Sequence, residues 1–357
     1  MRERNCHLFA TEPVEVLSGS GKEAIAELDD RPPGWWAAYF TYEWGHNFER
    51  ISDQRNDSVA LPEVTLVRFA RVRRVVLPPR RLEPRGSPEP LAWASSIDQK
   101  SFSEKVEAVH QLIRDGVCYQ INLTRRLSVS HRIDPRTLFE ALESINRSPR
   151  SFMLWLGETA VVSASPERFL YRNGSHVETS PIKGTGTSRR ALLASTKDRA
   201  ENVMIVDLAR NDLGRICQPG SISVPALCVP ELYPGVVHLV STVAGTLKPD
   251  IDSDEMLQAL FPPASITGAP KASVMQAIVD LEPVPRGIYC GAIGWIDTEH
   301  DRAALGVAIR TFTVGPDTTT LGVGAGITID SDPAAEWRET ELKARKLVQA
   351  AEHASAD

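Results

Sequence analysis

Apolar positions along the chain follow two spacings, and these predict a mixture of strands and helices. The segments GWWAAYFTYEWG (34–45) and VTLVRFARVRRVVL (64–77) are rich in aromatic and β-branched residues and predict two strands. Apolar residues then recur at helical spacing within 101–116, a segment that ends at Gly116. Ser101 and Glu104 have the spacing of a capping box at the start of this helix.

The rest of the chain continues this mixed order. Further strands are predicted at 118–130, 151–185, 238–247, 289–298, 302–315 and 318–330, and further helices at 135–147, 195–213, 253–261, 268–283 and 332–354. Pro270 is expected in the first turn of its helix, and Asn173-Gly174 predicts a hairpin turn. Many strands with helices between them indicate an α+β fold whose sheets are covered by helices.

A proline-rich segment, 77–93, divides the pattern. It reads as a linker or a long surface connection. We therefore expect an N-terminal β-rich portion at 1–90, packed on or continuous with the main domain, and a catalytic domain at 91–357.

Composition narrows the function classes. The 357 residues are 42% hydrophobic and carry a net charge of −6, which argues against a broad nucleic-acid surface. No run approaches the length of a membrane span, and the N-terminus lacks an apolar signal segment. The five cysteines include no C-x-x-C pair, so we expect free thiols in a cytoplasmic protein without membrane or nucleic-acid partners.

Two predicted helices carry carboxylates on faces that also hold apolar residues. Glu201 shares a face with Ile205, and Glu336, Glu339 and Lys343 form a stripe on the last helix. Two glutamates brought together from different helices would suit Mg²⁺, a hard cation that takes oxygen ligands. Spacing alone favours the other interpretation, two helices with solvent-exposed glutamates.

Two glycine-containing segments and one hairpin offer further candidates. GVGAG (322–326) has the wrong spacing for a dinucleotide loop, and its glycines indicate close approach of a ligand or neighbouring chain. SITGAPK (265–271) places free N–H groups before a helix, which alone is a simple cap. Glu167 and Lys183 would lie at the same end of the hairpin closed by Asn173-Gly174.

The order of several motifs is more specific than any one of them. SPERF, PIKGT, DRAEN-x-MIVDLARNDLGR, HLVSTVAGTL, FPPASITGAPK, YCGAIG, AIRTF, GAGI and a final E-x-x-E helix together resemble the chorismate-utilising enzymes, from about residue 95 to 350. The family includes anthranilate, aminodeoxychorismate, isochorismate and salicylate synthases. The resemblance implies an anthranilate-synthase-like fold: two large, mostly antiparallel sheets packed as a sandwich with helices outside.

Two positions relate the chain to one branch of that family. Isochorismate and salicylate synthases carry a lysine where this chain has Gln120, and anthranilate synthases typically carry alanine where it has Lys183. Gln120 is similar to the amine-transferring branch, and Lys183 resembles the aminodeoxychorismate synthases within it, in which the lysine bonds transiently to chorismate and ammonia displaces it. The alternatives are synthesis of anthranilate or of 2-amino-2-deoxyisochorismate, and, from another class, a catalytically inactive binding relative.

The resemblance also implies roles for individual residues. Lys183 would be the nucleophile, Glu167 the acid for the leaving hydroxyl, and His238 an acid–base residue whose part is less defined. The implied substrate-binding residues are Gly184, Thr185, Ser265, Tyr289, Arg310, Gly324, Ala325, Gly326 and Lys343. The implied Mg²⁺ ligands are Glu201 and Glu339, with Glu336 beside them. The chain shows no Cys-His-Glu amidotransferase signature, so we expect a separate glutaminase subunit to supply ammonia.

Overall fold

The computed structural model describes residues 6–20, 23–49, 51–57, 59, 61–76, 90–145, 148–186, 188–233 and 236–355. Most of the predicted linker, 77–89, lies outside these residues. No helix of the described part is long and apolar enough to cross a membrane.

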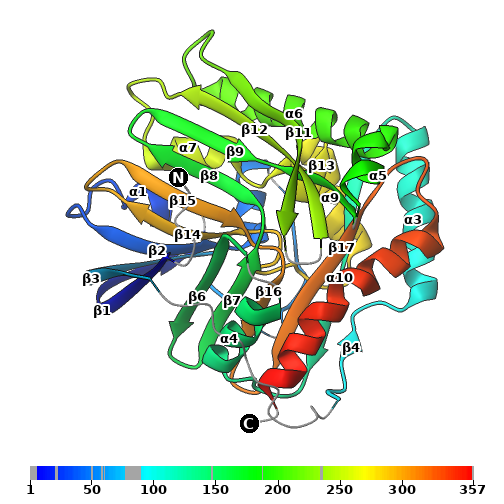
Figure 1. Ribbon diagram of the computed structural model, residues 1–357, viewed down its shortest axis with the longest axis horizontal. Helices are drawn as coiled ribbons and strands as arrows, with labels where there is room; N and C mark the ends of the chain where they lie inside the picture. The colour runs from blue at the N-terminus through cyan, green and yellow to red at the C-terminus, as the bar shows by residue number, and fades with distance from the viewer. Residues whose placement is uncertain are drawn as a thin grey trace.

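Two antiparallel sheets form the frame of the molecule (Figure 1). The larger sheet has the order β1 (Cys6–Gly19), β3 (Val64–Val76), β2 (Trp35–Phe40), β14 (Ala292–Asp297), β15 (Arg302–Val307), β8 (Arg168–Asn173), β9 (His176–Ser180), β12 (Val236–Thr246) and β10 (Ile182–Gly186), with β11 (Ser223–Tyr233) also paired to β12. The smaller has the order β13 (Gly268–Ala269), β5 (Gln120–Val129), β17 (Thr319–Ile327), β16 (Thr311–Val314), β7 (Thr159–Ser165) and β6 (Arg150–Leu156), with β4 (Ala94–Ser95) paired to β5. β2 lies between β3 and β14, so the N-terminal strands belong to the same sheet as the later ones.

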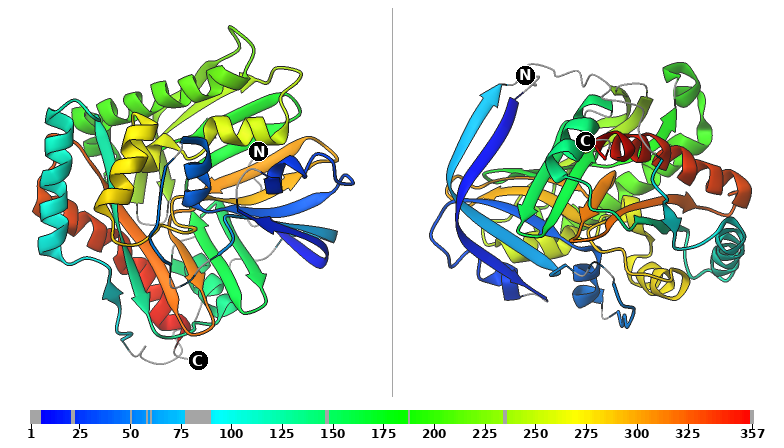
Figure 2. Two further views of the ribbon diagram at one scale, coloured as in Figure 1. Left: turned by 180° about the vertical axis from the view of Figure 1, so that it is seen from behind. Right: turned by 90° about the horizontal axis from the view of Figure 1, so that it is seen from below.

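Helices cover the outer faces of both sheets. They are α1 (Glu23–Ala26), the 3-10 turn η1 (Tyr42–Gly45), α2 (His46–Glu49), α3 (Gln99–Arg114), α4 (Pro135–Ile145), α5 (Arg189–Ala194), α6 (Thr196–Ile216), α7 (Ser253–Leu260), α8 (Ala264–Thr267), α9 (Lys271–Leu281) and α10 (Pro333–Ala354). Seen from behind in Figure 2, α7 and α9 (yellow) lie in front of the sheets, where α9 contacts β5 and β13 of the smaller sheet, and α10 (red) lies beside that sheet. The fold is α+β, as predicted.

Alternation along the strands explains the layers. In β7, Val161 packs between the sheets with Tyr39 and Ile293, whereas its neighbour Val162 packs outward in the cluster that contains Leu142 of α4 and Leu347 of α10. Successive side chains of a strand point to opposite faces, so one strand contributes to two apolar layers. The sandwich with outer helices implied by the motifs is confirmed.

Several local predictions differ from the structure. Asp98, not Ser101, caps α3: its carboxylate accepts the Ser101 N–H at 2.8 Å, so the capping box with Glu104 is wrong. Pro270 is the residue before α9 rather than part of its first turn. The predicted strand 34–45 ends at Phe40 and continues into η1.

Two strands were not predicted from the sequence because they contain prolines. β1 contains Pro13, and β11 contains Pro225 and Pro230. Proline cannot donate to a sheet, so it occurs on edge strands and at bulges. β1 lies at the edge of the larger sheet, and the pairing of β11 with β12 shifts register twice.

Candidate active site

The chain passes from one sheet to the other at two neighbouring points, and Glu167 and Arg310 lie at these points. β7 of the smaller sheet passes through Glu167 into β8 of the larger, and β15 passes through Arg310 into β16 in the other direction. The Val307 N–H donates to the Glu167 carbonyl at 3.1 Å, and the Ala164 N–H donates to the Arg310 carbonyl at 3.0 Å. Prediction of one strand over 302–315 was therefore wrong, because Arg310 turns the chain with φ 53°.

Lys183 extends from β10 toward β17. A Cβ atom placed on Gly326 would lie 3.1 Å from the Lys183 Nζ, so glycine at 326 leaves the space that the amine occupies. The residue as a whole is partly exposed, but burial lowers the pKa of the Lys183 amine below its ordinary value near 10.5, with the nearby Glu201 carboxylate opposing that shift. The site therefore favours the neutral, nucleophilic amine more than water does.

Glu167 is only 3% exposed, and its Oε1 accepts a hydrogen bond from the Ser265 hydroxyl at 2.5 Å. Burial raises the pKa of Glu167 to about 7, although Ser265 and Lys183 act in the opposite direction. Glu167 can therefore hold a proton at neutral pH, and Ser265, predicted to bind substrate, contacts it directly.

Gln120 lies at the same site as Lys183. In the sequence it served only to relate the chain to one branch of the family. It is fully buried, and among the described residues neither its Oε1 nor its Nε2 has a hydrogen-bond partner. A Cβ on Gly326 would lie 2.8 Å from the Gln120 Nε2, so the amide lies at the same place on β17 as the Lys183 amine. Buried polar atoms usually have a hydrogen-bond partner, so the Gln120 amide is available to bind a polar group of a ligand beside Lys183.

His238 on β12 links Arg310 to Thr185. The Arg310 guanidinium approaches His238 Nε2 at 2.9 Å, and Thr185 Oγ1 lies 2.9 Å from Nδ1. A guanidinium only donates, so Nε2 accepts and Nδ1 carries the proton that is donated to Thr185. Burial, with the nearby Arg310 charge, lowers the pKa of His238 to about 3. The ring is neutral at physiological pH and orients Arg310.

Helix α6 supplies Glu201 and fastens the strand that carries Lys183. Burial raises the pKa of Glu201, and the positive charges of Lys183 and, to a smaller extent, Lys197 oppose the shift. One turn of the helix also presents Asn202, 1% exposed, whose Nδ2 donates to the Leu239 carbonyl at 3.1 Å and to the Lys183 carbonyl at 3.4 Å. Asn202 was missed in the sequence, where it looks like one more polar helix residue.

Helix α10 faces the glycine-rich strand β17 from the other side. Lys343 donates from Nζ to Glu339 at 2.7 Å and to the Gly324 carbonyl at 2.9 Å. The Glu339 side chain is 49% exposed; its partial burial opposes ionisation, but the Lys343 ammonium outweighs this and holds the pKa of Glu339 below its ordinary value. Glu336 is buried and accepts a hydrogen bond from Ser331 at 2.7 Å. Burial raises the pKa of Glu336.

The glutamates have the chemistry of a divalent cation site. Glu201 and Glu339 come from different helices, and each negative charge makes ionisation of the other less favourable. A hard cation with oxygen ligands relieves such repulsion, so the residues fit Mg²⁺. They are not drawn into a tight cluster: within the described residues, only Asp297, Glu299 and His300, at the exposed β14–β15 turn, place three ligand atoms within 4.8 Å of one another.

Tyr289 lies apart from the Lys183 amine. A Cβ on Gly322 would come within 2.1 Å of the Tyr289 ring, so the ring packs against β17 at Gly322. Gly322 precedes Gly326 by four residues, or about 13 Å along a strand. Gly184, in contrast, is next to Lys183 with φ 83°, and its backbone lies close to Asp198. The structure thus gathers most predicted residues around Lys183 but places Tyr289 at Gly322, farther along β17.

Comparisons with known proteins agree with this architecture. The profile of a family described as "chorismate binding enzyme" matches residues 5–349. Aminodeoxychorismate synthase component 1 of Salmonella typhimurium is 36% identical over 346 residues, which cover 88% of this chain and 76% of that protein. The protein of the same name from Escherichia coli is 33% identical over 377 residues, covering 95% and 82% of the two chains.

A solved structure shows the same fold. Anthranilate synthase component I from Streptococcus pneumoniae superposes with a TM-score of 0.85 at 25% sequence identity, covering 98% of this chain and 93% of that one.

Proposed function

Because this chain belongs to the chorismate-binding enzymes, we propose that it aminates chorismate at C4 to give 4-amino-4-deoxychorismate. The observation that carries this proposal is the Lys183 amine, held against Gly326 in the same site as the protonatable Glu167. A buried amine with a lowered pKa is an activated nucleophile, and a buried carboxyl group with a raised pKa is a general acid at neutral pH.

The chemistry divides into two displacements. Lys183 Nζ bonds to C2 of chorismate, both conjugated double bonds of the ring shift, and the C4–O bond breaks as Glu167 gives its proton to the departing hydroxyl, which leaves as water. Ammonia then bonds to C4, both double bonds shift back, and the bond between C2 and Lys183 breaks. Hydroxide is a poor leaving group, so the first displacement requires the Glu167 proton.

Charged side chains near Lys183 suit the two carboxylates of chorismate. Arg310 presents a guanidinium that can bind a carboxylate through two parallel hydrogen bonds, and its contact with His238 fixes its direction. Lys343 adds a second cation from α10. Mg²⁺ held by Glu201 and Glu339, with Glu336 through water, would neutralise the carboxylate on the ring.

Ammonia would reach this chain from a separate glutaminase subunit. The relatives from Salmonella and Escherichia are named as component 1 of their synthase, which is consistent with a second component.

Product identification tests the proposal. Purified protein with chorismate, an ammonium salt and Mg²⁺ should form 4-amino-4-deoxychorismate, identified by mass and chromatography. Anthranilate as the sole product would replace this proposal with anthranilate synthesis, and recovery of unchanged chorismate would indicate a binding relative.

Glu201→Gln is expected to lower turnover by about 100-fold or more, because a charged carboxylate is a stronger ligand for the metal ion than a neutral amide of the same shape. The fold should persist, since the buried charge is removed. Turnover measured against Mg²⁺ concentration, with and without a chelator, should show weaker metal dependence in the variant. Unfolding of the variant at ordinary temperature would assign Glu201 a structural role instead.

His238→Leu is expected to raise the KM for chorismate by about 10-fold, because Arg310 loses the acceptor that orients it. His238→Gln, which keeps an acceptor, should recover much of the loss. The pH profile of kcat should be unchanged in both variants, since His238 stays neutral with a pKa of about 3. Loss of one limb of that profile would instead make the histidine an acid or base.

A further inference from the structure

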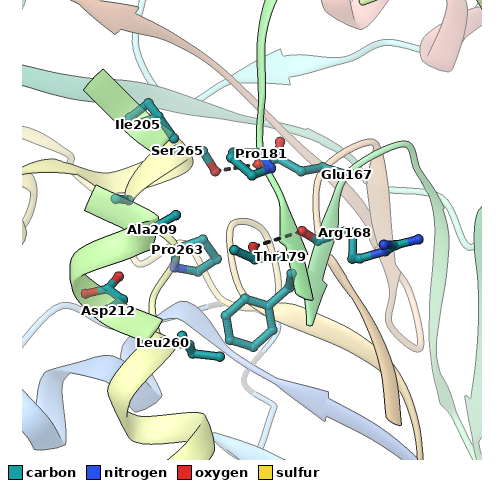
Figure 3. Close-up of a pocket in the computed structure, with 12 residues that line it drawn as sticks. Glu167, Arg168, Thr179, Pro181, Ile205, Ala209, Asp212, Leu260, Pro263 and Ser265 are labelled. Carbon is teal, nitrogen blue, oxygen red and sulfur yellow. Dashed lines mark hydrogen bonds between the residues drawn. The ribbon is translucent and has the colours of Figure 1, made fainter. Parts of the chain in front are cut away.

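A cavity lies behind Glu167, between α6 and the strands β8 and β9 (Figure 3). Its room for water is about 30 Å³, enough for about two water molecules. Ser265 and Thr179 contribute hydroxyl groups to its wall, and Ile205 and Ala209 contribute apolar surface from α6. A cavity with polar groups at several points can hold ordered water, whereas a wholly apolar one stays dry.

The cavity has a carboxyl group at each end. Glu167 and its partner Ser265 form one end, and Asp212 forms the other. Asp212 follows Ile205 by seven residues on the same face of α6, or about 10 Å along the helix. Its side chain is 15% exposed and lies 3.4 Å from the Lys271 ammonium, which is also 15% exposed. Asp212 therefore connects the cavity with the partly solvated surface.

The proposed reaction needs a proton at the inner end of this cavity in every cycle. Chorismate, ammonia and one proton give water and a product whose new amine is protonated. Glu167 gives that proton to the leaving hydroxyl and becomes a carboxylate while the covalent intermediate on Lys183 still occupies the active site. A route from behind would return the proton without passing the intermediate.

We infer that water in this cavity carries a proton from Asp212 to Glu167, so that Asp212 is a positioning and relay residue for the general acid. The inference rests on the proposed function. The proton leaves solvent at Asp212, moves through hydrogen-bonded water and the Ser265 hydroxyl, and forms the O–H bond of Glu167. Only protons move, so no oxidant or co-reactant is needed.

The surrounding charges permit such a transfer. Burial raises the pKa of Asp212, with Lys271 and Arg215 opposing the rise and Glu49 supporting it. At the other end, Lys183 and Arg150 face Glu167. Burial raises the pKa of both carboxyl groups. The two pKa values are therefore shifted in the same direction, and the shifts do not oppose proton transfer between the groups.

Asp212→Asn and its control Asp207→Asn test the relay. Asp207 lies on the same helix with its side chain 64% exposed, away from the cavity. In Asp212→Asn, the first turnover should proceed at the wild-type rate, because Glu167 is protonated before chorismate arrives. Later turnovers should slow about 10-fold and slow further in D₂O. Rapid-quench measurements should thus show a burst of one product per site, absent from wild type and Asp207→Asn.

Ala209→Leu provides a second test that leaves both carboxyl groups in place. The larger side chain fills the cavity and displaces water, so it should produce the same burst and the same sensitivity to D₂O. Wild-type kinetics in both variants would overturn the relay, and so would equal slowing of the first and later turnovers, which indicates a structural effect. The identity of the wild-type product tests the proposed function separately.

Discussion

Replacing Lys183 with alanine is expected to reduce formation of the aminated product by at least about 1,000-fold, because the variant lacks the nucleophile of the first displacement. Wild-type protein given chorismate without ammonia should accumulate an adduct with the mass of chorismate less one water, and the variant should not. Binding should be less affected than turnover, since Arg310 and Lys343 remain.

Lys100→Ala is the matched control for this experiment, because Lys100 is 86% exposed on α3. It should retain wild-type turnover and adduct formation. Intact-protein mass spectrometry after rapid quenching measures the adduct, and chromatography measures the product. Normal turnover of Lys183→Ala would show that the amine does not bond to the ring, and the proposed chemistry would then fail.

Glu167→Gln should lower kcat by about 100- to 10,000-fold, since glutamine keeps a hydrogen bond with Ser265 but cannot give a proton to the leaving hydroxyl. In the wild type, kcat should fall as pH rises through about 7, where Glu167 loses its proton. It should also fall at low pH, where Lys183 becomes an ammonium ion. The residual activity of the variant should lack the alkaline limb of this profile.

Although Glu167→Gln should lower kcat, it should raise the free energy of unfolding at alkaline pH. Burial raises the pKa of Glu167 from about 4.5 to about 7, so its contribution to stability is fully present below pH 4.5 and is lost as pH rises through 7. At pH 8, Glu167→Gln should therefore be more stable than wild type by up to about 3 kcal/mol, and near pH 4 the difference should disappear. Denaturant titration at the two pH values measures it.

Glu158→Gln serves as the control, because Glu158 is exposed at the β6–β7 turn. It should alter neither kcat nor the pH dependence of unfolding. If Glu167→Gln were less stable than wild type at pH 8, the charged carboxylate would be contributing net favourable contacts, and its role as a stored proton would be excluded.

Regular elements with strong periodicity could be predicted from sequence. The last helix was expected over 332–354 and occupies Pro333–Ala354, because its apolar residues repeat along one face and Asp332 caps it. The Asn173-Gly174 turn also formed as predicted, joining β8 to β9. Strands with internal prolines were not found, since local preference there opposes a pairing that only neighbouring strands stabilise.

The order of motifs along the chain identified the candidate catalytic residues, chiefly Lys183 and Glu167. The sequence alone could not place Glu167 and Arg310 on adjacent crossings between sheets, because that proximity depends on pairing between β8 and β15, more than 100 residues apart along the chain. Nor could the sequence show which ring nitrogen of His238 carries the proton, or that the Lys183 amine is buried. Proton positions and pKa values follow from burial and partner distances, and these exist only after distant segments have packed together.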